Sequence, residues 1–117
     1  MLLSEDKKCL KEVPKDYFGK LIVPEGVIRI GPYAMEGCTQ LSSIVIPASV
    51  KEVGLRAFFA CVSLEEVTIM SSDILFRPYV FDCCTSLSTI KVPRGSKSDF
   101  LLALKGQGVD EYLKEAD

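Results

Sequence analysis

Apolar and polar residues alternate in short stretches that recur along this chain at a fixed spacing. Three segments of equal length, twenty-three positions each, align without a gap at 21–43, 44–66 and 67–89, and a fourth begins at Ile90 and then diverges. Each unit closes on a leucine that opens the phrase L-x-x-[IV]-x-[IV]. The last part of this phrase alternates as a half-buried β-strand does. We therefore predict one strand at the beginning of each unit.

Equivalent positions of the units carry similar side chains, which arranges the sequence into columns. The clearest columns are Leu21, Ile44, Val67 and Ile90; Cys38, Cys61 and Cys84; and Leu41, Leu64 and Leu87. One unit of this length cannot bury both sides of its apolar set. Stacked units bury it, because like side chains then lie above one another and their strands pair in parallel about 4.8 Å apart. The columns predict a solenoid with a continuous core.

The second unit follows the phrase I-x-I-P-x-[ST]-V-x-x-I-G-x-x-A-F-x-x-C-x-x-L almost throughout. The matching residues are Ile44, Ile46, Pro47, Ser49, Val50, Val53, Gly54, Ala57, Phe58, Cys61 and Leu64. Over about residues 20–100 the chain resembles the BspA-like leucine-rich repeat family of bacterial and protist proteins. The third unit departs from the phrase at Met70, Asp73 and Arg77, which leaves the conformation of its turn open. The predicted fold class is a leucine-rich-repeat solenoid, a short right-handed horseshoe with a parallel sheet.

An open solenoid must cover its terminal apolar layers. We expect an irregular or hairpin cap over 1–19, repeats over 20–93 with a partial fourth unit from residue 90, and a helical cap over 94–117, all in one structural domain. Ser96 suits the start of a helix and Gly106 its end. Helical spacing of the apolar residues beyond it predicts a second short helix. Both ends fit a complete small protein or one complete module.

Composition narrows the function classes. Formal net charge is −2 with acids and bases interspersed, so the clustered cations of a nucleic-acid binder are missing. No apolar run approaches the roughly 18–20 residues of a membrane span, and the first residues lack the pattern of a secretory signal. Histidine is absent, which removes the commonest general base and metal ligand. We expect no catalytic residue, no metal, no cofactor and no membrane insertion.

The cysteines are five in number. Cys38, Cys61 and Cys84 stand one repeat length apart, so stacking brings them within disulfide range, but their side chains should run parallel to one another. We expect buried thiols that pack as small hydrophobes. No CxxC pair is present, which disfavours zinc. Cys9 and Cys83 are expected to be more exposed.

Binding in such solenoids commonly uses the outward strand positions of the sheet. The candidate concave binding face consists of Lys20, Ile22, Ser43, Val45, Glu66, Thr68, Thr89 and Lys91. Its N-terminal half is apolar and its C-terminal half is polar. The alternative is an ordinary solvated sheet made of good β-formers.

A second candidate surface lies in the middle unit. Leu55, Phe59 and Val62 fall in columns where the flanking units carry proline, an acid and threonine, respectively. Apolar residues at positions that are polar in the neighbours predict an exposed association patch. The alternative is local packing beneath a loop.

These observations favour a non-catalytic interaction module that binds a protein or, as a second ligand class, a glycan. The family resemblance implies adhesion or host-factor binding, in proteins that are often secreted or displayed at the cell surface, whereas the chain as given has the features of a cytoplasmic protein. The alternative function is an intracellular scaffold protein that self-associates as a weak homo-oligomer. A thiol-based enzyme is the third hypothesis.

Overall fold

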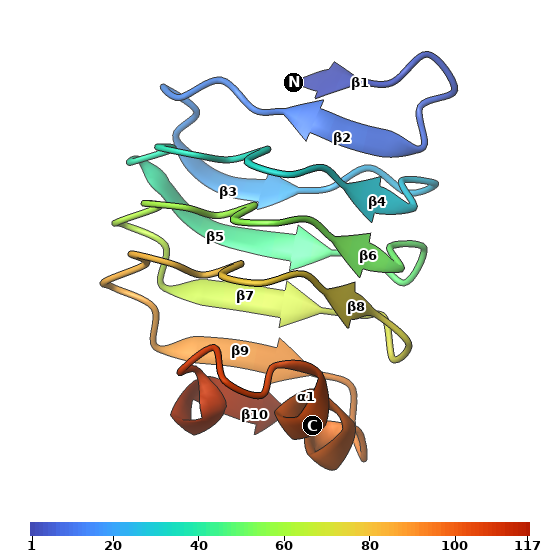
Figure 1. Cartoon of the computed structure of the whole chain (residues 1–117), viewed down its shortest axis with the longest axis vertical. Helices are drawn as coiled ribbons and strands as arrows, with labels where there is room; N and C mark the ends of the chain where they lie inside the picture. The colour runs from blue at the N-terminus through green and yellow to red at the C-terminus, as the bar shows by residue number, and fades with distance from the viewer.

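The chain coils into successive turns that build two sheets, one on each of two sides, in which all strands except β1 (Leu2–Leu3) pair in parallel (Figure 1). The structure is a computed structural model and describes residues 1–117. The long sheet has the order β10-β9-β7-β5-β3, with strands β3 (Gly19–Ile22), β5 (Leu41–Ile46), β7 (Glu66–Ile69), β9 (Thr89–Val92) and β10 (Leu113–Glu115). The short sheet has the order β1-β2-β4-β6-β8, with β1 (Leu2–Leu3), β2 (Cys9–Glu12), β4 (Arg29–Ile30), β6 (Glu52–Val53) and β8 (Leu75–Phe76).

The predicted columns are ladders of the core. Ile44 pairs with Leu21 on one side and with Val67 on the other, and Val67 pairs with Ile90. The closing leucines are also buried, with exposed fractions of 0% for Leu41, 0% for Leu64 and 6% for Leu87. Equal units stacked in register give each apolar side chain a like neighbour, so a single core runs through the solenoid. The repeat register predicted from the sequence is confirmed.

Both ends of the solenoid have a cap, and each cap lies at an end of the short sheet. At the N-terminus β1 and β2 form an antiparallel hairpin, and β2 then pairs in parallel with β4. At the C-terminus helix α1 (Lys97–Ala103) buries Phe100, whose ring lies 6.1 Å from the ring of Phe76 in an edge-on arrangement. Of the two alternatives for the N-terminal cap, irregular or hairpin, the structure has the hairpin, and it also has a cap helix after the repeats.

The prediction of a second helix after Gly108 is wrong. Residues Asp110–Tyr112 form a single 3₁₀ turn, η1, and the chain continues as β10. Leu113 pairs with Ile90 and is 2% exposed, so it takes the next place in a core column. Helical spacing of apolar residues was outweighed by the backbone hydrogen bonds and the burial that the open edge of β9 offers.

The short sheet is also absent from the sequence prediction. Its repeat strands β4, β6 and β8 are two residues long. A strand of two residues is too short to show an alternation of apolar and polar positions, so it leaves no period-two signal. Strand β8 forms although its unit departs from the repeat phrase.

The third side of the coil consists of turns, at residues 31–40, 54–63 and 77–86, which we call the turn ladder. Backbone hydrogen bonds also join these turns, for example from the Tyr33 N–H to the Leu55 carbonyl at 3.0 Å. One close approach there requires glycine. A Cβ at Gly54 would lie 2.6 Å from the backbone nitrogen of Pro32 in the preceding turn.

Candidate functional site

The eight residues of the predicted binding face lie together on the outward side of the long sheet. Alternate positions of a strand point to opposite faces, so these side chains face away from the core. The pairing register arranges them in two rows, Lys20–Ser43–Glu66–Thr89 and Ile22–Val45–Thr68–Lys91. The structure therefore brings all eight together as one surface across four strands.

The character of this face changes along the solenoid axis. Ile22, at the N-terminal end, is 62% exposed, and Val45 beside it is half-buried. At the other end Lys91 pairs in register with Lys114 of β10. The sequence did not place Lys114 on this face, because residues 109–116 were expected to be helical. The N-terminal end therefore presents exposed Ile22 together with Lys20, whereas the C-terminal end presents the two cations Lys91 and Lys114.

One ion pair crosses the face. Lys91 Nζ lies 3.8 Å from Glu66 Oε1, and both side chains are 45% exposed. An exposed pair at this distance contributes little to stability. It leaves both groups accessible to a ligand.

Phe18, which was not predicted as part of the face, is an exposed apolar residue directly before β3. It stands one repeat length before Leu41, in the buried leucine column, yet it is 79% exposed. The cause is a register shift at the start of β3, where Gly19 pairs with Leu41. The shift moves Phe18 out of the core and beside the free edge of the long sheet.

The predicted association patch lies on the turn ladder. Leu55 and Phe59 are half-buried, and Val62 is 41% exposed. Phe59 is partly covered by Arg56, whose guanidinium carbon lies 5.7 Å from the centre of its ring. The three residues thus belong to the same turn, and a cation stacks over the ring of Phe59.

Arg56 is the centre of a larger cluster that sequence reasoning missed. Tyr33, Arg56 and Tyr79 occupy one column, all with positive φ, and the Arg56 guanidinium lies 5.0 Å from the centre of the Tyr79 ring. Tyr33, followed by Asp82, raises the pKa of Arg56. Arg56 Nε lies 3.5 Å from Asp82 Oδ2, close enough for an ion pair but without hydrogen-bond geometry, so this nitrogen has no hydrogen-bond partner. The spacing of Tyr33, Arg56 and Tyr79 by one repeat length was the available signal.

The repeated cysteines are free thiols that donate hydrogen bonds. Cys61 Sγ donates to the Met35 carbonyl at 3.0 Å, and Cys84 Sγ donates to the Phe58 carbonyl at 3.1 Å. Burial raises the pKa of Cys38 and Cys61, and it raises the pKa of Cys84 to about 12. A thiol that stays protonated is a poor nucleophile, so the column has a structural role.

The repeated turns, the parallel ladders and the cysteine column agree with one family of known proteins. The chain matches the family described as BspA type Leucine rich repeat region (6 copies) over residues 11–100. The chain belongs to this family. Its BspA-type repeats are stacked units of a kind that generally forms extended binding surfaces rather than catalytic sites.

Other comparisons with known proteins add one structural neighbour. No functionally curated protein matches the sequence. A leucine rich cell surface protein of Faecalibacterium prausnitzii A2-165, solved as a crystal structure, is similar with a TM-score of 0.43 and 21% sequence identity. The likeness covers 86% of this chain and 39% of that one, so the chain spans about two fifths of the length of its neighbour.

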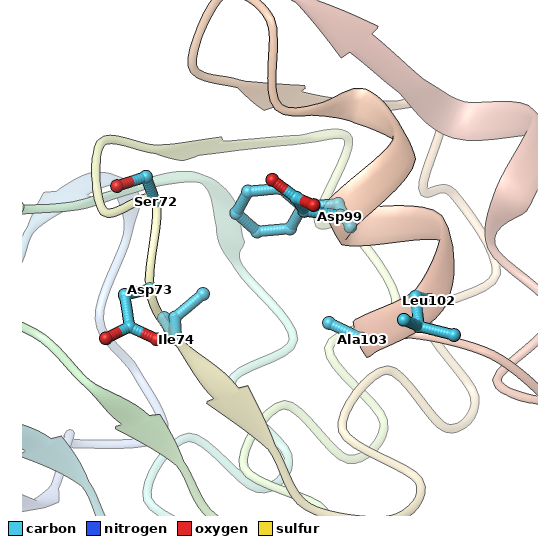
Figure 2. A pocket seen from close by; sticks show the side chains of 7 residues that line it. Ser72, Asp73, Ile74, Asp99, Leu102 and Ala103 are labelled. Atoms are coloured by element: carbon cyan, nitrogen blue, oxygen red, sulfur yellow. The ribbon is translucent and has the colours of Figure 1, made fainter.

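A hollow of about 390 Å³ separates the third BspA-type repeat from its C-terminal cap. Ser72, Asp73 and Ile74 line one side and helix α1 lines the other, with Asp99 and Leu102 among its residues (Figure 2). The Asp73 carboxylate is directed away from the helix in this view. The structure contains no group of three or more His, Cys, Asp or Glu side chains that could hold a metal ion. None of its helices has the length and apolar character needed to cross a membrane.

Proposed function

We propose that this chain is a non-catalytic interaction module that binds a protein ligand on the outward face of its long sheet. The observation that carries the proposal is the pair of continuous rows across β3, β5, β7 and β9. A continuous ladder of side chains on a stacked-repeat sheet is the kind of surface that solenoid proteins use for recognition. Membership of a repeat family with this architecture supports the same role.

The distribution of apolar and charged side chains over the face indicates the chemistry of the partner's contact surface. Ile22 and Phe18 present large exposed apolar area at one end, which gains free energy when a partner removes it from water. Lys91 and Lys114 present cations at the other end, which attract acidic side chains over a distance of about 10 Å. We therefore propose a protein partner whose contact surface is apolar on one side and acidic on the other.

A direct test uses a charge placed in the centre of the face. Val45→Arg adds a long cationic side chain at a half-buried position of β5. It should lower the affinity for an identified partner by at least about tenfold, or 1.4 kcal/mol. Ala48→Arg is the matched control, because Ala48 is exposed in the loop that follows β5. Partners captured from cells are identified and then measured by calorimetry with purified proteins. Equal affinities for the two variants would exclude this face.

The ligand class and the cellular role are further parts of the proposal. Adhesion at a cell surface is the role we propose for a protein ligand, and a glycan is the alternative ligand. A glycan array probed with the Val45→Arg and Ala48→Arg variants separates the two classes, since only a glycan ligand gives array signals that Val45→Arg removes. Cell fractionation with an antibody against the native protein tests the surface location.

The cluster around Arg56 favours a second candidate function, self-association as an intracellular scaffold. Phe59 and Tyr79 present aromatic surface around a cation that keeps one nitrogen without a hydrogen-bond partner. Aromatic and arginine side chains are enriched at the centres of protein interfaces. Analytical ultracentrifugation of the purified protein tests this function, and a monomer at all concentrations would rule it out.

A further inference from the structure

The backbone hydrogen bonds that join one turn of the turn ladder to the next all run in one direction. In the first turn the N–H groups of alternate residues donate to carbonyls of the second turn, and the second turn donates to the third in the same way. The donor–acceptor pairs are Tyr33 to Leu55 at 3.0 Å, Met35 to Ala57 at 2.8 Å, Gly37 to Phe59 at 2.8 Å, Arg56 to Pro78 at 3.2 Å, Phe58 to Val80 at 3.0 Å and Ala60 to Asp82 at 2.9 Å.

The third turn repeats this row of donors but has no turn beyond it. The N–H groups of Tyr79, Phe81 and Cys83 have no acceptor in the chain. Cys83 has φ 61°, the same as Ala60 one turn earlier. The local backbone is therefore alike, and these donors face the C-terminal end of the ladder as Ala60 faces the third turn.

At its opposite end the ladder is closed. The Ala34 carbonyl accepts a hydrogen bond from the Val13 N–H at 2.9 Å, and the Glu36 carbonyl accepts one from Lys15 Nζ at 2.7 Å. The N-terminal cap therefore satisfies groups that an earlier turn would have bonded. Only the C-terminal end keeps a row of donors free.

A hollow of about 270 Å³ adjoins these free donors. Phe81 and Cys83 lie on one side of it, and Val109 and Tyr112 of the C-terminal segment lie on the other. Gln107 borders the hollow, and its side-chain amide bridges two backbone groups of the third turn whose equivalents in the second turn, the Ala57 N–H and the Gly54 carbonyl, bond directly to each other. Its amide donates to the Arg77 carbonyl and accepts from the Val80 N–H, both at 3.0 Å.

We propose that this hollow binds a short peptide segment of a partner protein through the segment's backbone carbonyls. Carbonyl oxygens two residues apart would accept hydrogen bonds from the Phe81 and Cys83 N–H groups. The solenoid itself identifies the occupant, because the two equivalent donor rows each hold a polypeptide segment bonded in this manner. This site lies on the turn ladder and is independent of the long-sheet face proposed above.

The side-chain preference of the site follows from the same repetition. In the chain's own ladder the two acceptor carbonyls flank an apolar residue, Phe58 in the second turn and Phe81 in the third. The residue before the second of these carbonyls is therefore expected to be apolar in the ligand. Buried Val109 and Leu87 border the hollow where such a side chain would lie.

The probe for this site is a peptide copied from the chain's own second turn. It spans residues 55–60, is acetylated and amidated, and has D-alanine in place of Ala60, whose φ of 61° a D-residue adopts without strain. The peptide is added to the intact protein and amide signals are followed by NMR. We expect saturable shifts at Phe81 and Cys83, and slower hydrogen exchange of both amides.

A pair of variants tests where the peptide binds. Thr85 is exposed and borders the hollow, and Thr39 is its exposed equivalent in the first turn. Thr85→Trp should lower the affinity of the protein for the peptide by at least about tenfold, whereas Thr39→Trp should leave this affinity unchanged. Equal affinities for the two variants would overturn the proposal.

Other results would also overturn it. One is slow exchange of the Phe81 and Cys83 amides in the free protein, as slow as that of Phe58 and Ala60, because the row would then already be covered. Another is that sodium acetate shifts the Phe81 and Cys83 amide signals as much as the peptide does, which would show a general anion site. Absence of any saturable shift at these amides would exclude the site directly. Because Val45 is on another side of the coil, Val45→Arg should not alter peptide binding.

Discussion

Cys61 Sγ donates a hydrogen bond of 3.0 Å to the carbonyl of Met35, one turn earlier in the solenoid. Cys84 makes the same bond to Phe58. A hydrophobe of equal size would fill the space but could not donate, and a serine would donate but add a more polar group to the core. The repeated cysteine is therefore explained by small volume together with a weak donor.

Thiol labelling should separate the five cysteines. Exposed Cys83 should react with a maleimide at the rate of a model thiol, and Cys61 should react only after denaturant is added. With a pKa of about 12, Cys84 has a thiolate fraction of about one in ten thousand at about pH 8, so it too should react slowly. Mass spectrometry of timed samples identifies the modified residue. Cys83→Ser should remove the fast phase, and rapid native labelling of Cys61 would contradict its burial.

Gly54→Ala should be strongly destabilising. The added Cβ would lie 2.6 Å from the Pro32 nitrogen and 2.7 Å from the Gly31 carbonyl carbon, both in the backbone, so the turns must separate. We expect a loss of about 3 kcal/mol or more in the free energy of unfolding. Gly26→Ala is the control, because its Cβ meets nothing within 4 Å and only its positive φ of 94° opposes the change. It should cost about 1–2 kcal/mol, and urea denaturation compares the two.

Leu64→Ala tests the core ladder. Leu64 is fully buried in the central unit, so truncation should cost about 2–5 kcal/mol through lost burial and the cavity left behind. Val62→Ala removes a side chain that is 41% exposed nearby and should change stability by no more than about 0.5 kcal/mol. Thermal melts followed by circular dichroism measure both. An unchanged melting temperature for Leu64→Ala would contradict the repeat register.

Phe59→Glu tests the association patch. The flanking units carry Glu36 and Asp82 in this column, so the fold accommodates an acid there, and Arg56 is close enough to pair with it. We expect a stability change below about 1 kcal/mol together with a shift of any oligomer toward monomer in sedimentation. Thr39→Glu adds the same charge at an exposed position and should leave assembly unchanged. A large loss of stability would show that Phe59 belongs to the core.

Glu115 should make the C-terminal cap sensitive to acid. Backbone hydrogen bonds from the N–H groups of Lys97 and Gly95 lower the pKa of Glu115 below its ordinary value of 4.5. A lowered folded pKa stabilises the cap above about pH 4.5, and this contribution is lost as pH falls through the folded value. NMR should show the carboxyl titrating below 4.5 and the Lys97 amide exchanging faster in acid. Glu115→Gln should remove this pH dependence. Titration at or above the ordinary value would contradict the hydrogen bonds.

Much of the fold could be predicted from the sequence because each sequence repeat corresponds to one coil of the solenoid and contributes the same positions to the core. Leu41, Leu64 and Leu87 recur once per unit and are buried in one column. Two parts could not be predicted. Leu113 has neighbours in the sequence that suit a helix, and only the open edge of β9 selects a strand. Phe18 continues the leucine column in the sequence, and only the register shift at Gly19 exposes it.

The candidate surfaces were less predictable, since position in a repeat says which way a side chain points and not what touches it. The two rows of the long-sheet face follow from strand alternation and were placed correctly as neighbours, while their use as a binding site stays a prediction. The stack of Arg56 on Tyr79 depends on turn residues with positive φ. No apolar periodicity marks such residues.

The equivalent pairing of Ser43, Ile44 and Val45 with both neighbouring strands has a consequence for the length of the molecule. Strand β5 receives β3 on one side and β7 on the other with equivalent partners, so residues 44–66 could be followed by a second copy of themselves. Each copy would keep one of the present neighbours, the two copies of β5 would pair with each other at the new junction, and the protein would lengthen by one strand spacing, about 4.8 Å. The architecture fixes the cross-section and leaves the number of coils open.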